Sequence, residues 1–428
     1  MNKQPRTRLE QLTSQRRLSV PAFQREFSVR AEKKLGKRLE VSLSQAKRWL
    51  GGVPGVPRGE SQLVLEAWFQ EPVAQLLGPP RFQHRSINET ELAVNAGRES
   101  VSHAIAAAAA LDPSVLEHLH AAAEYAARAY YVTPPLEMLS DLVALRDTVY
   151  NQIDRTHKPL QQAQLYLIAG QVCGLLSSVS WDLGLLGAAA EQARAAHTYG
   201  SVIDHPSLQA WARALQVTAM FWSGHPRGAV AIAARAIEVA PIGTAKARLH
   251  SVHARSLAMI GARGEVRAEL AAASNELDRA GGDAFLDDIG GELAFDRARR
   301  GLCAGASYVA LADGDQAEHE AQDAVALFAA IPEEERWAAG AVGAQVDLGA
   351  ARALRGDLAG AQAALISVFE LAPARRTEAI AQRLHALARM LGTTHYRGAL
   401  EARDLGDAIE NFTSTSLARM AAPRALNP

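Results

Sequence analysis

Apolar residues recur at three- and four-residue intervals along most of the chain, which is the periodicity of amphipathic helices. In the first 80 residues this periodicity predicts five short helices, over residues 7–17, 20–35, 42–50, 61–69 and 72–77. Glycine and two prolines at positions 78–80 then interrupt the pattern. We therefore expect an all-α chain that begins with a small helical domain over residues 1–80.

The third predicted helix combines an apolar stripe with a polar face. Leu43, Ala46 and Leu50 fall on one side, and Trp49 beside them is expected in the core. Ser42 is placed to cap the helix, and two glycines follow it. Such a helix can lie in a major groove, where glutamine and arginine read base edges and lysine pairs with phosphate. An ordinary surface helix would show the same pattern.

Charge is distributed unevenly along the chain. Residues 1–60 hold 14 lysines and arginines against 5 acidic residues, a local charge of +9, although the whole chain has a net charge of −1. This contrast predicts a polyanion-binding module on an acidic body. The N-terminus lacks the apolar segment of a signal peptide, and the alanine-rich run at 105–111 is too short to span a membrane. Cys173 and Cys303 form no disulfide or metal pattern and are expected in the core of a cytoplasmic protein.

The run Val41-Ser-Leu-Ser-Gln-Ala-Lys-Arg-Trp-Leu-Gly-Gly52 resembles the recognition helix of Xre/Cro-type helix-turn-helix regulators, whose pattern is V-S-x-S-x-x-x-R-W-x-x-G. Residues 58–80 resemble the end of the same domain in actinobacterial members, whereas residues 20–40 run longer than in compact Cro-like domains. The resemblance implies that a first group of residues lies nearest the bases of double-stranded DNA: Ser42, Leu43, Ser44 and Arg48. It implies that Gln45 and Lys47 flank them or meet phosphate. The basic residues Lys37 and Arg38 are further candidates for phosphate contacts. A surface salt bridge for Arg48 and a solvated basic face are the alternatives.

A connecting segment is expected over residues 81–159. After a polar stretch at 81–88, the pattern predicts helices over residues 89–111, 113–131 and 136–153. These helices resemble the segment between the DNA-binding and sensory parts of the same actinobacterial regulators. They are interpreted either as a dimerisation or lever element or as a cap on the next domain.

Residues 160–420 contain an internal repeat. Starting from five glycines, at positions 184, 224, 261, 314 and 356, small or apolar residues recur five and twelve positions later in most units. From Gly314 these offsets fall on His319 and Ala326. Closely crossing helices need small side chains, and the turn between them needs glycine, so the pattern predicts stacked helix pairs. It resembles the tetratricopeptide repeat and predicts a TPR-like α-solenoid, with an inserted loop at 281–295 and a final pair at 377–391 and 396–412.

The sequence lacks the motifs of most catalytic and metal sites. It contains no glycine-rich phosphate loop, no HExxH motif and no cysteine pair, so we expect neither an enzyme nor a cofactor. His250 and His253 could share a metal, but two histidines rarely suffice, and Arg255 is unfavourable nearby. Five acidic residues, Asp278, Asp283, Asp287, Asp288 and Glu292, lack the spacing of a calcium loop. A solvated loop is the preferred interpretation, and no metal is expected.

Together these features predict a cytoplasmic transcriptional regulator. Its head would read an operator half-site, and homodimerisation is expected because one short helix rarely supplies enough affinity. The order of parts is similar to that of peptide-pheromone receptors, so the array is expected to sense a peptide, small molecule or partner protein. Candidate ligand-binding residues are Gln171, Arg213, Gln216, His250, His253 and Tyr308. The alternative is a protein–protein scaffold with weak or vestigial DNA binding.

Overall fold

The computed structural model describes residues 5–52, 57, 59–80, 89–107, 113–156, 158–279 and 281–421. Every regular element in this part of the chain is a helix, which confirms the all-α prediction. The internal contacts divide the chain into two compact units, Met1–Arg98 and Glu99–Pro428. The division falls within helix α6 (Glu89–Ala107), whereas the sequence analysis placed its first boundary after residue 80.

The first unit contains five helices with caps that the sequence supplies. Their bounds are α1 Arg8–Gln15, α2 Val20–Leu35, α3 Leu43–Gly51, α4 Glu60–Phe69 and α5 Val73–Leu76. Ser19 caps the amino terminus of α2, where its hydroxyl accepts from the amide of Ala22. Gly36 ends the helix with a φ of +70°, a conformation that glycine adopts without steric cost. The predicted bounds of all five helices lie within two residues of the observed ones.

Aromatic side chains form the centre of the first unit. Phe23 on α2 stacks on Trp68 of α4 with ring centroids 5.2 Å apart, and Phe27 meets Trp49 of α3 at 5.9 Å. All four side chains are buried, which confirms the predicted core position of Trp49. Because large buried rings carry much of the burial energy of so small a core, these contacts hold α3 against α2.

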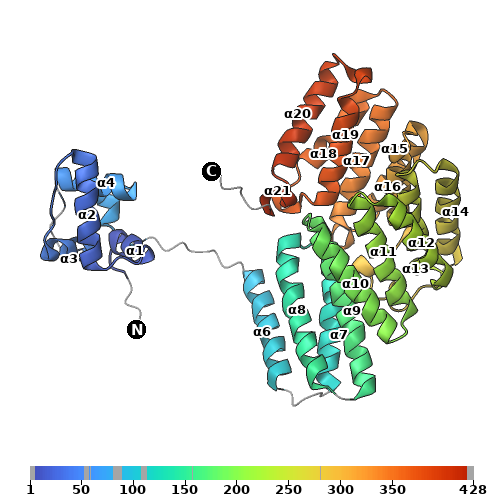
Figure 1. Ribbon diagram of the computed structural model, residues 1–428, viewed down its shortest axis with the longest axis horizontal. Helices are drawn as coiled ribbons and strands as arrows, with labels where there is room; N and C mark the ends of the chain where they lie inside the picture. Colours follow the sequence, from blue (N-terminus) through green and yellow to red (C-terminus); the bar gives the residue numbers. More distant parts are fainter. Residues whose placement is uncertain are drawn as a thin grey trace. The chain divides into compact units, whose positions relative to one another are not determined.

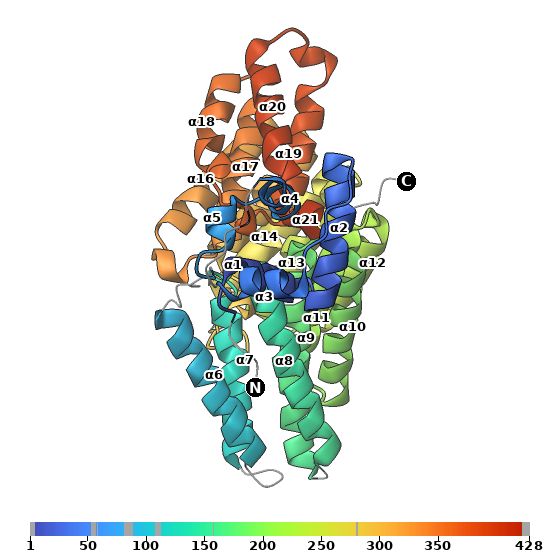
Figure 2. The same ribbon diagram turned by 90° about the vertical axis from the view of Figure 1, so that its left-hand side faces the viewer.

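The second unit begins with the remainder of α6 and two helices that pack on a series of helix pairs. Helix α7 is Pro113–Ala129 and α8 is Pro135–Arg155, and both contact α9 (Figures 1 and 2). The predicted helices at 113–131 and 136–153 match α7 and α8 closely, whereas residues 108–111 of the predicted helix 89–111 lie outside the described residues. The helices of the expected connecting segment from α7 onward therefore belong to the same compact unit as the pairs.

Six helix pairs follow in the chain. Their bounds are α9 Pro159–Asp182 and α10 Leu186–Val202, α11 Pro206–Trp222 and α12 Pro226–Val239, α13 Thr244–Ala258 and α14 Arg263–Arg279, α15 Arg297–Ala310 and α16 Gly314–Ala329, α17 Ala338–Leu354 and α18 Leu358–Phe369, and α19 Glu378–Leu391 and α20 Leu400–Ser414. Short elements complete the unit: η1 Gly291–Leu293, η2 Glu333–Glu335, η3 Pro373–Arg375, η4 Thr394–Tyr396 and α21 Leu417–Ala421.

The turns within the pairs follow the predicted glycines in four places and differ in one. Gly184, Gly224, Gly261 and Gly356 have positive φ angles between +77° and +82°, and a helix begins two residues after each. In the fourth pair the left-handed residue is Ala312, with φ of +54°, and Gly314 is already the first residue of α16. The predicted register of this pair was therefore two residues too late.

The corrected register makes the five pairs alike. Five and twelve residues after the left-handed residue, every second helix has a buried alanine or valine: Ala189 and Ala196, Ala229 and Ala236, Val266 and Ala273, Ala317 and Ala324, and Ala361 and Val368. His319 and Ala326, which the sequence analysis assigned to these positions, are exposed. Small side chains at two contact positions let the helices of a pair approach closely.

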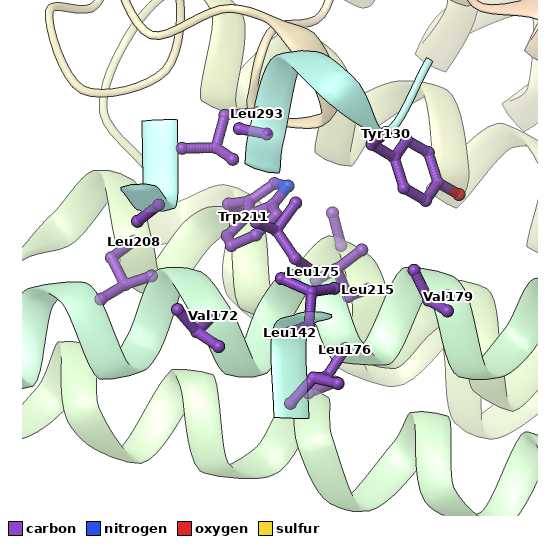
Figure 3. Close-up of a cluster of buried hydrophobic side chains, with 14 of the residues drawn as sticks. Tyr130, Leu142, Val172, Leu175, Leu176, Val179, Leu208, Trp211, Leu215 and Leu293 are labelled. Atoms are coloured by element: carbon purple, nitrogen blue, oxygen red, sulfur yellow. The ribbon is translucent and has the colours of Figure 1, made fainter. Parts of the chain in front are cut away.

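Helices of neighbouring pairs also pack closely, as the crossing of α9 and α11 shows. Trp211 of α11 is fully buried, and Figure 3 shows it among Leu175, Leu208 and Leu293. A Cβ atom placed on Gly174 of α9 would lie 2.1 Å from the indole ring of Trp211. Only glycine at position 174 leaves room for the ring in this position.

The first helices of the pairs form a closed layer. Each of α9, α11, α13, α15 and α17 contacts the next first helix, and α19 contacts α9 again. Helix α9 is long and apolar enough to cross a membrane, the one such helix among the described residues, but 78% of its apolar window is buried inside the protein. Its apolar character is thus accounted for by its central place in this layer.

The predicted insert at 281–295 exists, but it is not a solvated loop. Leu286 and Leu293 are fully buried in the main core of the second unit, and Glu292 is buried as well. The Ser207 hydroxyl of α11 donates to Asp283, and the Thr244 hydroxyl of α13 donates to Asp287. The acidic side chains of the insert therefore anchor it to the first helices, which the sequence interpretation did not anticipate.

Candidate functional site

Helix α3 carries the residues that resemble a recognition helix, and it begins with two reciprocal side-chain caps. The Ser42 hydroxyl accepts from the amide of Gln45 at 3.2 Å, and the Gln45 side-chain oxygen accepts from the amide of Ser42 at 3.2 Å. This capping box satisfies two amides that the helix itself leaves free. Gly52 ends the helix with φ of +70°. In this structure Ser42 and Gln45 therefore stabilise the helix terminus.

One face of α3 is buried and the other is free. Ala46, Trp49 and Leu50 are buried, whereas a larger group is exposed: Ser42, Leu43, Ser44, Gln45, Lys47 and Arg48. Leu43 was expected on the inward stripe, but 44% of its surface is exposed. It is the first residue of the helix, where no neighbouring turn covers it. All six predicted residues of α3 thus lie on accessible surface.

Two hydrogen bonds from other helices fix the ends of α3. The Gln24 side-chain amide of α2 donates to the carbonyl of Val41 at 2.7 Å, just before the helix begins. The Thr7 hydroxyl, before α1, donates to the carbonyl of Leu50 at 2.7 Å, where the helix ends. With the buried rings behind it, the helix is held as a rigid rod whose polar face points outward.

The cations around α3 differ in whether they have acidic partners. Lys37 lies 2.6 Å from a carboxylate oxygen of Glu60, and Arg38 lies 3.2 Å from one of Glu40. Lys47 and Arg48 have no ion pair among the described residues, and the Arg48 Nε donates only to the carbonyl of Ser44 at 3.4 Å. The expected alternative of a salt bridge for Arg48 is absent from this part of the chain. These two cations are free to meet phosphate or base edges.

The predicted ligand-binding residues of the array face neighbouring helices. The Gln216 amide donates to the carbonyl of Ala193 on α10, and Arg213 donates to the Gln216 side-chain oxygen at 2.7 Å. Gln171 is buried on α9, and Tyr308 is buried in a core cluster with residues of α13 and α14. These four residues therefore do not gather at one site.

His250 and His253 of α13 share an acidic partner. Oε2 of Glu269 on α14 lies 2.6 Å from Nδ1 of His250 and 3.2 Å from Nδ1 of His253. Burial by itself would raise the pKa of Glu269, but the two imidazoles outweigh it and lower the pKa to about 2. Among the described residues no three histidine, cysteine or acidic side chains are arranged to hold a metal ion. The cluster is an interhelical contact between α13 and α14.

A cavity of about 100 Å³ lies at the layer of first helices and is lined by residues of α9, α11, α13, α15, α17, α19 and the insert. Four arginines line it, Arg248, Arg255, Arg299 and Arg383, together with one carboxylate, that of Glu292. The remaining walls include Tyr130, Trp181, Phe295 and Trp337. None of the six predicted ligand-binding residues lines this cavity, because those residues turn toward the second helices or into the core.

Two of the four arginines hold the insert. Nη2 of Arg299 donates to Oε2 of Glu292 at 2.9 Å, and Nη1 of Arg299 donates to the carbonyl of Ala294 at 2.8 Å. Arg248 donates from Nη2 to three successive carbonyls, those of residues 292–294. Ser178 of α9 donates to the other oxygen of Glu292 at 2.9 Å. The hydrogen-bonding capacity of Arg299 and of Arg248 Nη2 is thus largely used inside the protein.

The other two arginines, Arg383 and Arg255, make fewer hydrogen bonds inside the protein. Arg383 donates from Nε to both oxygens of the buried Asp347, at 3.1 and 3.2 Å. Arg255 has no hydrogen bond or ion pair among the described residues, and its guanidinium lies 4.7 Å from the ring centroid of Phe221 and 5.2 Å from that of Trp222. Burial, and secondarily the charge of Arg383, lowers the pKa of Arg255 to about 10. A charged group is therefore held where its surroundings disfavour the charge.

A buried acid lies beside this cavity. The Tyr130 hydroxyl donates to Oδ2 of Asp182 at 2.6 Å, and Oδ1 of Asp182 has no hydrogen-bond partner among the described residues. Burial raises the pKa of Asp182 to about 7, and the bond from Tyr130 opposes this rise only in part.

A second cavity, of about 380 Å³, lies among α10, α11 and α12 and is lined by His197, Arg213 and Arg235. It is the one of the two cavities that includes a predicted ligand-binding residue, Arg213. Burial and the charge of Arg235 lower the pKa of Arg213.

The arginines of the first cavity were missed because they are far apart in sequence. Arg248 and Arg255 lie seven residues apart on α13, which places them on one helix face, but Arg299 and Arg383 belong to other pairs. The one sequence feature that could have indicated the cavity is the presence of isolated arginines on otherwise apolar first helices. In the sequence, Arg255 bears only on the metal-binding alternative for His250 and His253, which it disfavours.

No protein-family model matches the chain, and no curated protein is significantly similar to it.

Proposed function

We propose that this chain is a cytoplasmic DNA-binding transcriptional regulator. Its first unit would be a helix-turn-helix head of the Xre type, with α3 as the reading helix. Its second unit would be a TPR-like array that dimerises and senses a ligand. The observation that carries the proposal is α3 itself, which buries Ala46, Trp49 and Leu50 and leaves Lys47 and Arg48 exposed without acidic partners.

The surroundings of α3 support a nucleic-acid partner. Residues 1–60 carry an excess of nine positive charges, and phosphate contacts supply much of the affinity of DNA-binding proteins. Ser44 and Arg48 lie four residues apart and therefore on one helix face, where their side chains can reach neighbouring base edges. The capped and anchored helix would need little reorganisation on binding.

The repeat supports the proposal for the second unit. With the register set by Ala312, five successive pairs place small residues at the same two offsets, which is the way that TPR-like pairs pack. One short reading helix rarely provides enough affinity alone, so the active species would be a homodimer on two half-sites.

The test begins with selection of DNA from a random pool by the full-length protein, followed by fluorescence anisotropy on the selected sequence at two salt concentrations. We expect specific binding with a steep salt dependence. Ser44→Ala/Arg48→Ala should reduce affinity to that for unselected DNA, because loss of base contacts leaves only the phosphate contacts.

The matched control is Arg267→Ala, which removes one exposed arginine from α14 in the second unit. It should leave the affinity for selected DNA unchanged. Failure to enrich any sequence, or equal binding by the wild type and the double variant, would refute α3 as the reading helix. The protein–protein scaffold with vestigial DNA binding would then be the better description. Sedimentation of the complex would give the protein-to-DNA ratio and thus test the dimer.

A further inference from the structure

We propose that the arginine-lined cavity of the first-helix layer binds a small organic anion, whose carboxylate or phosphate group pairs with Arg255. This deepens the proposed function, since it gives the chemical class of the ligand that the array would sense. All the residues of this cavity belong to the second unit.

Arg255 is the group that lacks a partner. It lies partly buried in the cavity wall, and its guanidinium lies over the rings of Phe221 and Trp222, which do not themselves line the cavity, rather than against an acceptor. A guanidinium presents five N–H donors, and removing them from water without acceptors costs free energy. An anion would supply the acceptors and the opposite charge together.

The charges around the cavity do not balance without a ligand. Four arginines line it against the single carboxylate of Glu292, and counting Asp347, the partner of Arg383, and Asp296, whose charge acts on Arg299, still leaves one arginine in excess. The thiol of Cys303 in the cavity wall is close enough to feel these charges. Burial raises its pKa, and the charges of all four arginines oppose that rise in part. The positive side chains therefore converge on one region.

The internal anion Glu292 shows what this region accepts. Its carboxylate is held by Arg299 and by the Ser178 hydroxyl, at 2.9 Å each, and is buried. Arg299 is committed to this carboxylate and to the insert backbone, and Arg248 is held by the same backbone through Nη2, although its Nε has no partner among the described residues. The charge of Asp347 acts on both Arg255 and Arg383, but among the described residues only Arg383 donates hydrogen bonds to it, which leaves the donors of Arg255 without an acceptor.

Size and wall chemistry define the rest of the ligand. The cavity of about 100 Å³ is smaller than the roughly 300–1,000 Å³ of typical drug-sized sites, and the insert contributes Glu292 and Phe295 to its walls. An extended peptide would not fit in this space. Trp181, Phe295 and Trp337 in the walls favour an apolar or aromatic body attached to the acidic group.

The test is isothermal titration calorimetry of full-length protein with three probes that share a phenyl ring: phenylacetate, phenyl phosphate and phenylacetamide, the neutral isostere of phenylacetate. We expect saturable binding of at least one anion and none of the amide. The tighter of the two anions identifies the ligand as a carboxylate or a phosphate. Arg255→Met, which keeps an unbranched apolar side chain, should weaken anion binding about ten- to a hundredfold.

Two further variants make the result specific. Arg255→Lys keeps the charge and should lose less affinity than Arg255→Met, which separates loss of charge from loss of folding. Arg235→Met removes an arginine from the other cavity and should bind as the wild type does. Absence of saturable anion binding, equal binding of the amide, or loss of binding in Arg235→Met rather than Arg255→Met would overturn the proposal.

DNA binding measured on the same samples separates the two proposals. Anion binding without DNA binding would leave this inference standing and refute the regulator. DNA binding without anion binding would support the regulator and refute the anion site.

Discussion

The hydroxyl of Thr7 donates a 2.7 Å hydrogen bond to the carbonyl of Leu50, across 43 residues of sequence. The same hydroxyl accepts from the amide of Glu10 at 3.0 Å and thus caps α1. One threonine therefore joins the beginning of the first helix to the end of the helix that we propose reads DNA.

Replacing Thr7 with valine should loosen α3 while keeping the shape of the buried side chain. Loss of the cap and of a buried hydrogen bond should destabilise the first unit by about 1–2 kcal/mol. Hydrogen exchange of full-length protein, read in peptides that cover α3, measures the change as faster exchange. Ser28→Ala, which removes only a local 3.3 Å bond to the carbonyl of Gln24, is the control. Unchanged exchange in Thr7→Val would show that the aromatic core alone positions the helix.

Lys47 and Lys37 should differ in how they affect the salt dependence of DNA binding. Lys47 has no acidic partner among the described residues, whereas Lys37 pairs with Glu60. If Lys47 meets a phosphate, Lys47→Ala should reduce the slope of log affinity against log salt by about 1. Lys37→Ala should change it less, since its charge is already partly balanced. The comparison is made by anisotropy at several salt concentrations, and equal slopes for the two variants would contradict the assignment.

Gly174→Ala should destabilise the second unit strongly. The added methyl would meet the indole of Trp211, so the crossing of α9 and α11 would have to open at a cost of about 1–3 kcal/mol or more. Gly187→Ala on α10, where an added Cβ meets nothing within 4 Å, is the matched control and should be neutral or slightly stabilising. Thermal unfolding followed by circular dichroism gives the comparison. If the clash is the cause, Gly174→Ala should cost less in a Trp211→Leu background than in the wild type.

Asp182 should make the second unit less stable as the pH rises toward neutrality. Its pKa is about 7 in the folded protein and about 3.9 in an unfolded chain, so folding favours the protonated form. Its contribution is fully present below about pH 4 and is lost as the pH rises through 7. Asp182→Asn cannot ionise, and its advantage over the wild type should grow by roughly 1–3 kcal/mol between pH 5 and pH 8.

Denaturant unfolding at the two pH values measures this difference. Asp154→Asn, which changes an exposed carboxylate, should show no such growth. If Asp182→Asn also gains nothing at pH 8, the acid is ionised in the folded protein.

The local structure could be predicted from sequence because caps, turns and apolar spacing act within a few residues. Ser42 and Gln45 produced the expected helix start, and four of five turn glycines adopted the left-handed conformation. The prediction for the fifth turn was wrong because Ala312, not a glycine, takes the left-handed conformation, at a cost of only about 1–2 kcal/mol. A search for turn glycines therefore selects Gly314, two residues too late.

The cavity could not be predicted in this way. Its arginines come from α13, α15 and α19, and they meet only because the layer of first helices curves back on itself. Curvature depends on small rotations accumulated over many pairs, which no single pair encodes. For the same reason the sequence placed His250 and His253 on α13 but did not show which way they face. They face α14, where both imidazoles contact Glu269.

The contact between α19 and α9 also changes how this array should fold. In an open repeat protein each pair meets only its neighbours, so terminal pairs can fray and folding can start anywhere and spread. Here the last pair completes contacts with the first across more than 190 residues, from Asp182 to Glu378 and beyond. Joining segments so distant in sequence slows folding, but it removes the free ends from which a repeat array would unravel. The second unit should therefore unfold in one cooperative transition, and deletion of its final pair should weaken every pair rather than the last one alone.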